Sequence, residues 1–435
     1  MFVKLIRDKQ MISTKMKIVV FVVLIFGFLS GNAKDSLSLT IKRADSIFIK
    51  NNLMLLAAQF NIQASKALKI QAKLYPNPNI YVEQSLINKY TRANYDKDST
   101  KTGNTETIVQ IQQLILLAGK RNKQIRIADI NAKLTETEFE NILRTLRLQL
   151  HTDLAELFYN LSALKLLKEE QESIAILSSS LESNTLNGFI STNEIVRIKS
   201  LLLEVSKDVN EYRNRNFYLQ AELNTLLNIS AETSIKPLLS EAIELRNMNL
   251  VTVIDSAKVY NPDLKTSNYL VELAQAQYNL SKAMAVPDPY VQLMYDKSGN
   301  YIRNYYGLGL GISLPVFNRN QGNIKVSKFS IDQNETKLKQ QQLTVSAQII
   351  STFSALDNNK DLLDKYRTNY EQQLLDLMDK VLESYKKRLI SLVDFTNYYE
   401  SYKQSYLSLL NIKTELLNNV EQINFLVGKP IISFN

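Results

Sequence analysis

The chain has 435 residues, of which 45% are hydrophobic, and it contains 11 glycines and no cysteine. The lack of cysteine excludes disulfides, thiolate metal sites and a lipid anchor on cysteine. The net charge is +9, of which the first 33 residues carry +4, and the other basic residues are spread along the chain. A nucleic-acid-binding protein would need a basic cluster, so we expect no nucleic-acid partner.

Residues 1–33 have the three parts of a Sec signal peptide. Basic residues precede an unbroken apolar run from Ile18 to Leu29, and small residues follow at Gly31 and Ala33. This run of about a dozen residues is short for a bilayer span, but it suits a signal peptide that is removed on export. We therefore expect the mature chain to begin at Lys34, outside the cytoplasm.

The rest of the chain contains the same series of elements twice. The predicted parts are repeat 1 at residues 34–228, a linker at 229–248, repeat 2 at 249–428 and a tail at 429–435. Each repeat opens with a short helical segment, which starts at Leu37 in the first copy, and a longer helix. Asn51-Asn52 and Asn261-Pro262 separate the two helices. Such a duplication favours one architecture built from two similar halves.

A pair of prolines follows the longer helix in each repeat, Pro76 with Pro78 and Pro287 with Pro289. Proline lacks an amide donor and disfavours helix in the residue before it, so each pair marks a hinge where the helix ends. The pattern then alternates with a period of two, which indicates strands. The predicted strands are residues 80–88, 105–115, 290–297 and 305–314.

The predicted strands have roughly the length that crosses an outer membrane when tilted, and tyrosines gather near their ends. Four strands cannot close a membrane barrel, because the smallest barrels have about eight. Open sheet edges have no hydrogen-bond partners in lipid. Several chains would therefore share one barrel, and three chains would supply twelve strands. The alternative is a soluble four-stranded sheet that carries two coiled-coil arms.

A very long helix follows the strands in each repeat, from about Asn122 to Leu186 and from about Asn323 to Lys387. A returning helix starts near Ile195 and again near Phe395, with apolar residues at alternating spacings of three and four. This period of 3.5 predicts left-handed coiled-coil hairpins over residues 122–227 and 323–427. The second predicted seam includes Phe395, Tyr398 and Tyr402.

The lengths of these helices suggest how they fit together. The returning helix and the shorter pre-strand helix together have nearly the rise of the long helix, which is roughly 95 Å at about 1.5 Å per residue. We therefore expect two short helices to stack end to end along each long one. The linker and the tail would then lie at mid-height.

Each hairpin turns at a short tip that combines apolar and capping residues. The tip residues are Gly188, Ile190, Ser191 and Glu194 in the first hairpin and Ile390, Ser391 and Asp394 in the second. The glycine suits a left-handed helix terminus. Each serine has an acidic residue three positions later, which is the spacing of a capping box at the start of the returning helix.

The sequence contains no arrangement of residues that is typical of an enzyme. His151 is the only histidine, and we expect it on a helix surface rather than at a metal site. The alternating Gly307, Gly309 and Gly311 are typical of a strand and not of a nucleotide-binding loop, because no Lys-Ser/Thr follows them. We therefore expect no catalytic residues, no metal and no cofactor.

In these features the sequence resembles the TolC family of outer-membrane efflux proteins. The resemblance rests on the proline pairs, on Leu117-Ala118-Gly119-Lys120-Arg121 and Leu314-Pro315-Val316-Phe317-Asn318 after the strands, and on Leu223-Asn224-Thr225-Leu226-Leu227 at the end of the first hairpin. It implies a mixed fold with two internal repeats, in which a homotrimer forms a 12-stranded transmembrane β-barrel continued by an α-helical periplasmic tunnel. Gly119 and Pro315 would join the proline pairs as helix-to-barrel hinges.

The resemblance also implies partners and a location. The tunnel tip would dock on a periplasmic adaptor, the membrane fusion protein, which links it to an inner-membrane transporter. The barrel would contact outer-membrane lipid in a Gram-negative-type envelope. We expect the tip residues to contact the adaptor, and the alternative is that they pack neighbouring hairpins together. Asp376 and Asp379 are candidates for a constriction of the lumen, unless they only form a solvated helix face.

The sequence is compatible with three functions. The first is a passive exit duct for small molecules or ions in a tripartite efflux system. The second is the same duct in type I protein secretion. The third, from another class, is a soluble periplasmic coiled-coil scaffold. The exported substrate is expected to depend on the inner-membrane pump.

Overall fold

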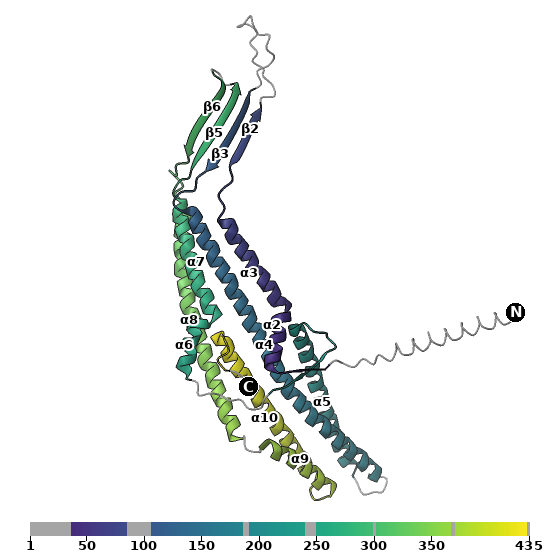
Figure 1. Ribbon diagram of the computed structural model, residues 1–435. Helices are drawn as coiled ribbons and strands as arrows, with labels where there is room; N and C mark the ends of the chain where they lie inside the picture. Colours follow the sequence, from purple (N-terminus) through teal and green to yellow (C-terminus); the bar gives the residue numbers. More distant parts are fainter. Residues whose placement is uncertain are drawn as a thin grey trace, which may run out of the picture.

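The structure is a computed structural model that describes residues 36–84, 106–185, 191–239, 249–298, 302–366 and 370–432. It is an elongated molecule with a small sheet at one end and long helices running away from it (Figure 1). The predicted signal peptide lies outside the described residues. No helix in the described ranges is both long and apolar enough to span a membrane.

The two repeats contain matching elements in the same order. The first has β1 (Ser36–Leu39), α2 (Ile41–Asn51), α3 (Leu53–Ala72), β2 (Asn79–Gln84), β3 (Thr107–Leu114), α4 (Lys120–Thr185) and α5 (Thr192–Leu227). The second has β4 (Ser234–Pro237), α6 (Leu250–Tyr260), α7 (Pro262–Met284), β5 (Pro289–Ser298), β6 (Arg303–Ile312), α8 (Gln321–Lys365), α9 (Tyr370–Lys386) and α10 (Leu392–Val427).

The sheet and the helices below it share one lateral order. The four strands are antiparallel and ordered β2-β3-β5-β6. Below them, α3 packs on α4, α4 on α7 and α7 on α8, so each strand stands over the helix that it joins (Figure 1). The two repeats therefore form one continuous wall, joined through β3 and β5 in the sheet and through α4 and α7 in the helices.

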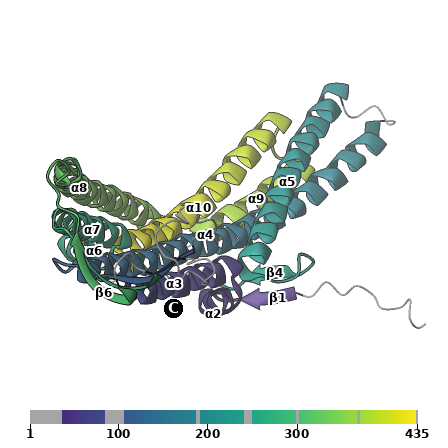
Figure 2. The same cartoon turned by 90° about the horizontal axis from the view of Figure 1, so that it is seen from above.

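Two short helices stack along one long helix, as their lengths predict. Helix α4 has 66 residues, and α3 with 20 and α5 with 36 both pack against it. The short helices meet where the Nδ2 of Asn52 donates to the carbonyl oxygen of Leu226 at 2.8 Å. Asn261 makes the same bond to Leu426 at 2.6 Å in the second repeat. The hairpins extend away from the end of the wall formed by α7 and α8 (Figure 2).

The described parts of the linker, residues 229–239, and of the tail, residues 429–432, lie at mid-height (Figure 1), and part of the linker forms a strand that the sequence did not indicate. Strand β4 pairs in parallel with β1, so residues 36–39 form a strand where a helix was predicted from Leu37. The side chain of Gln220 on α5 holds this small sheet through both backbone groups of Ile235, at 2.7 and 2.8 Å. Backbone pairing between segments about 200 residues apart is invisible to local periodicity.

The predicted long helix 323–387 is divided in the structure. Helix α8 ends at Lys365, and Tyr370 begins the separate helix α9. The last buried residue of α8 is Leu356, and burial resumes at Leu374. None of the described residues between them, 357–366 and 370–373, is buried. Packing of a buried face provides most of a helix's stability.

The seam of α10 also departs from the prediction. Tyr398 is 47% exposed, whereas the neighbouring Tyr399 is 5% exposed. Tyr399 belongs to a core cluster that joins both hairpins near their tips, together with Phe395 and residues of α4, α5 and α9. A helix that packs on two neighbours buries a second stripe, so a single period of 3.5 does not identify all of its buried positions.

Candidate functional site

The two faces of the four-stranded sheet have different chemistry. Residues paired across the strands share a face, and one such row is Ile80, Ile111, Leu293 and Leu308. The adjacent row on the opposite face is Asn79, Gln112, Gln292 and Gly309. No described element covers the apolar face, and Leu308 and Leu310 are 73% and 79% exposed. A sheet of this kind would need an apolar environment on one side and a polar one on the other.

The predicted hinge prolines lie where helices meet strands, with Pro289 as the first residue of β5, and an ion pair joins the two junctions. The Nζ of Lys120 lies 2.6 Å from the Oδ2 of Asp288, between Pro287 and Pro289, and also donates to the carbonyl of Val286 at 2.6 Å. The other oxygen of Asp288 accepts from the amide of Leu117 at 2.8 Å. The side chain of Lys120 is only 4% exposed, so this buried contact fixes one repeat against the other.

The other hinge residues occupy the same junctions. Gly119 lies one position before α4 and has a φ of +63°. Glycine adopts this left-handed conformation without strain. Pro76 accepts a hydrogen bond from Gln113 at 3.1 Å through its carbonyl oxygen. Pro78 directly precedes β2, and Pro315 lies between β6 and α8. All these residues are found where helices meet strands.

Glu194 connects the two hairpins near their tips and does not complete a capping box. Its Oε1 accepts from the hydroxyl of Tyr385 at 2.5 Å and from Arg388 at 2.8 Å. Burial and the Glu194 carboxylate raise the pKa of the Tyr385 hydroxyl, so it stays a donor. The expected capping box at Ser191 is therefore wrong, and Ser191 accepts from the amide of Asn193 at 3.3 Å.

The second tip follows the prediction more closely. Ser391 and Asp394 form the complete capping box at the start of α10. Arg388 has a φ of 60° and ends the preceding helix in the left-handed region. Ile390 is partly buried against the shared core of the hairpins, and the exposed apolar residue is its neighbour Leu389, at 72%. Gly188 and Ile190 of the first tip lie outside the described residues.

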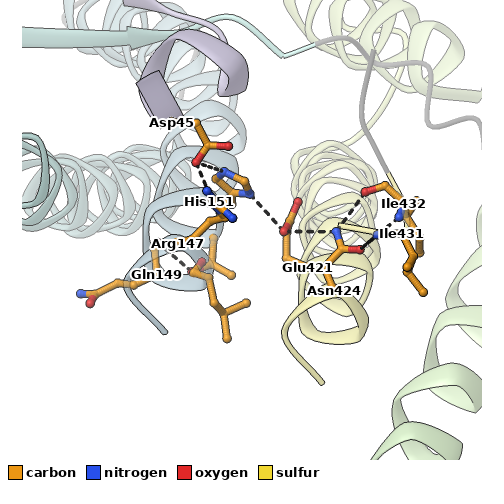
Figure 3. Close-up of polar contacts among 10 residues, drawn as sticks. Asp45, Arg147, Gln149, His151, Glu421, Asn424, Ile431 and Ile432 are labelled. Carbon is orange, nitrogen blue, oxygen red and sulfur yellow. Dashed lines mark hydrogen bonds and ion pairs between the residues drawn. The ribbon is translucent and has the colours of Figure 1, made fainter. Parts of the chain in front are cut away.

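His151 is buried, so the expectation of a surface position was wrong. It is 6% exposed and lies between Asp45 of α2 and Glu421 of α10 (Figure 3). Its Nε2 is 3.2 Å from Asp45, and its Nδ1 is 3.0 Å from Glu421. Burial alone would lower the imidazole pKa, but the two carboxylates outweigh it and raise the pKa to about 9. The imidazolium therefore joins elements of both repeats as an ion-pair bridge.

Further charged and polar side chains surround this bridge. Arg147 donates to Asp45 at 3.2 Å, and Asn424 is held by the backbone of Ile431 and Ile432 in the tail (Figure 3). Arg144 donates to the carbonyl of Phe425 at 3.0 Å. Among the described residues, no three metal-ligating side chains gather closely enough to hold a metal ion. The charged cluster of Asp45, Arg147, His151 and Glu421 therefore connects the two repeats at mid-height.

Asp376 and Asp379 lie together on α9 and face α4. Both side chains are exposed, and they line one side of a cavity whose other side carries Glu169 and Glu170. The Nε2 of Gln372 donates to Asp376 at 2.8 Å. Glu170 and Tyr385 were not among the site residues predicted from the sequence. Glu170 could have been found, because it falls three residues after Leu167 and four before Ile174, on an otherwise apolar stripe.

Comparisons with known proteins agree with this architecture. The sequence pattern of the family described as outer membrane efflux protein matches residues 253–429. The cobalt-zinc-cadmium resistance protein CzcC of Cupriavidus metallidurans is 22% identical over 298 residues, which are 66% of this chain and 65% of that protein. The match thus spans slightly less than two thirds of the relative's length.

Solved structures share the fold over most of the chain. The Campylobacter jejuni CmeC outer membrane channel superposes with a TM-score of 0.76 at 14% identity, covering 89% of this chain and 85% of that one. The outer membrane protein VceC of Vibrio cholerae gives a TM-score of 0.70 at 14% identity, covering 89% and 96%. CusC gives 0.71 at 14% identity, covering 89% and 92%.

Proposed function

Because residues 253–429 match the outer membrane efflux protein family and the fold matches solved outer-membrane channels, we propose that the chain belongs to this family and is the outer-membrane channel of a tripartite efflux system. In this role it is a passive exit duct for small molecules or ions. An inner-membrane pump delivers them through a periplasmic adaptor. The sheet lies in the outer membrane of a Gram-negative-type envelope, and the helices extend into the periplasm.

The observation that carries this proposal is the uncovered apolar face of the sheet. In the described residues β2 and β6 each pair with a single strand, so the sheet of one chain has two open edges. Lipid does not tolerate unpaired backbone groups. Three chains joined edge to edge supply twelve strands, which is within the range of closed membrane barrels. The apolar face then contacts lipid, and the glutamine- and glycine-rich face lines the pore.

Exposed apolar side chains on the two outer helices of the wall support a homotrimer. On α3, Leu53 and Phe60 are 61% and 65% exposed, and on α8, Val326 and Phe329 are 65% and 70% exposed. These helices lie at opposite ends of the helical row (Figure 1). A ring forms when one side of each chain contacts the other side of the next. Burial of both faces in such a ring removes this apolar area from water.

The hairpin tips form the surface for the periplasmic adaptor. Ser191 and Ser391 begin the returning helices there, and the exposed Leu389 supplies an apolar contact. The alternative is that these residues only pack neighbouring hairpins together. A cysteine at Ser191 should crosslink to the adaptor in an active pump, and the absence of any crosslink would contradict the docking role.

We expect the inner-membrane pump, rather than this chain, to select the class of substrate. The relative CzcC is named for resistance to cobalt, zinc and cadmium, so metal ions are one class that the duct would carry. Transport through a wide lumen requires no tight site. Type I protein secretion is the second candidate for the same duct, and the identity of the partner pump distinguishes the two.

Two substitutions at adjacent residues of β5 test the membrane role. Leu293 lies on the apolar face and Gln292 on the polar face. A lysine on the lipid face costs roughly 2–4 kcal/mol at mid-membrane, so Leu293→Lys should reduce the amount of heat-modifiable trimer in the outer-membrane fraction. Gln292→Lys should leave that amount unchanged. Recovery of the native chain as a soluble periplasmic protein would instead favour the coiled-coil scaffold.

A further inference from the structure

A cavity of about 290 Å³ lies beside the hairpin core, lined by residues of α4, α9 and α10. Its walls combine carboxylates with apolar side chains. The acidic and polar residues that line it are Glu169, Glu170, Ser173, Gln372, Asp376, Asp379 and Tyr399. The apolar part includes Leu166, Ile174, Leu375, Met378 and Leu382. Negative charge and apolar surface therefore lie side by side in one cavity that is open to solvent on one side.

Glu170 is the buried carboxylate of this cavity, and one of its oxygens is unpartnered. The residue is 7% exposed. Its Oε2 accepts from the hydroxyl of Tyr399 at 2.6 Å, whereas Oε1 has no hydrogen-bond partner among the described residues. Burying a charged oxygen without a partner is unfavourable. Burial raises the pKa of the Glu170 carboxyl to about 7, although the Tyr399 hydrogen bond and the charge of Lys403 act against it.

Lys403, whose charge acts on the Glu170 carboxylate, does not hydrogen-bond to Oε1. Lys403 on α10 points its Nζ to Asp208 on α5 at 3.1 Å and to Glu400 at 3.2 Å. The two negative charges of Asp208 and Glu400 already exceed the single positive charge of Lys403. The cavity therefore keeps an excess of negative charge from Glu169, Glu170, Asp376 and Asp379.

We propose that this cavity binds an organic ammonium ion, which donates a hydrogen bond to Oε1 of Glu170 and lays its alkyl body against the apolar wall. Asp376 and Asp379 at the opposite side provide a second position for positive charge. A diammonium compound with a short alkyl spacer suits this arrangement. A directly coordinated metal ion suits it less, since no three metal-ligating side chains of the described residues gather closely enough to hold one. The site lies within one chain and does not depend on the proposed transport function.

Calorimetry on the purified full-length protein in detergent tests this site, with hexane-1,6-diammonium as the probe and hexane-1,6-diol as the uncharged control. Glu170→Gln keeps an oxygen for Tyr399 and removes the charge. Loss of a charged hydrogen bond should weaken diammonium binding at least about tenfold. Glu172→Gln, an exposed position on the same helix outside the cavity lining, should leave the affinity unchanged.

Two further measurements make the result decisive. The native affinity should rise between pH 6 and pH 8, because Glu170 must be ionised to accept an ammonium ion. Thermal unfolding of the Glu170→Gln protein must match that of the Glu172→Gln protein to show that the fold is kept. Equal binding by the two variants, equal binding of the diol, or binding of Co²⁺ in place of the diammonium compound would each overturn the proposal. Loss of duct activity with intact binding would contradict the proposed function alone.

Discussion

Asn52 donates a hydrogen bond from Nδ2 to the carbonyl oxygen of Leu226 at 2.8 Å, while its Oδ1 accepts from the amide of Leu55 at 3.0 Å. One side chain therefore caps the start of α3 and satisfies a free carbonyl at the end of α5. Asn261 does the same for α7 and Leu426 in the second repeat. These hydrogen bonds hold the two short helices α3 and α5 end to end, so that together they extend along α4.

Replacing Asn52 should separate the two parts of this contact. Asn52→Ala removes both bonds and should lower the free energy of unfolding by about 1–2 kcal/mol. Asn52→Asp keeps the cap and loses the donor, so its free energy of unfolding should lie between those of the native chain and the alanine variant. Denaturant unfolding of the purified protein measures both, with the exposed Lys50→Ala as control. Equal stability of the aspartate variant and the native chain would show that the Leu226 contact contributes nothing, and equal stability of the alanine and aspartate variants would show the same for the cap.

The His151 bridge should make stability depend on pH. Its folded-state pKa of about 9 lies above the ordinary 6.5. The stabilisation is therefore fully present below pH 6.5 and is lost as the pH rises to about 9. The shift corresponds to on the order of 3 kcal/mol. Thermal unfolding between pH 6 and pH 10 should show this loss in the native chain and a flatter profile in His151→Gln.

The contact of Glu194 with Tyr385 and Arg388 should hold the hairpins together at the tip. Glu194→Ala and Tyr385→Phe each remove a hydrogen bond between the hairpins, so both should increase the single-channel conductance in planar bilayers. Glu383→Gln is the matched control, since Glu383 is exposed and pairs only with Lys387 on its own helix turn. The same conductance in all three variants would show that this contact does not restrict the proposed tunnel.

The buried pair of Lys120 and Asp288 should behave as a coupled unit. Removing one partner leaves a buried charge alone, so Lys120→Met or Asp288→Asn should each destabilise the protein by about 3–5 kcal/mol. The double variant should recover part of that loss, because no lone charge remains. The apparent melting temperature of the proposed trimer on gels measures the effect. Additive losses in the double variant would rule out a direct coupling.

Local sequence patterns predicted most of the elements. The proline pairs break the chain between helix and strand because proline cannot donate a backbone hydrogen bond. The period of two fits the strands, and the period of 3.5 fits α5, where Ile198, Val205 and Leu219 are buried. These features depend on residues a few positions apart, so they can be read without knowledge of the fold.

The candidate sites were predicted less completely, because they combine residues from distant parts of the chain. Ser191 with Glu194 and Ser391 with Asp394 have the same spacing, yet only the second pair forms a capping box. Glu194 instead binds Tyr385, which is 191 positions away. The partner that a carboxylate finds depends on which helix lies beside it.

The sequence by itself determined the two repeats, the breaks at the prolines and the hairpins with their tips. Only the tertiary structure decided that β3 pairs with β5, that His151 lies between Asp45 and Glu421, and that one oxygen of Glu170 is buried without a partner. The physical reason is that helix and strand formation follow local periodicity and backbone geometry. Burial and charge pairing depend on which distant elements share a face.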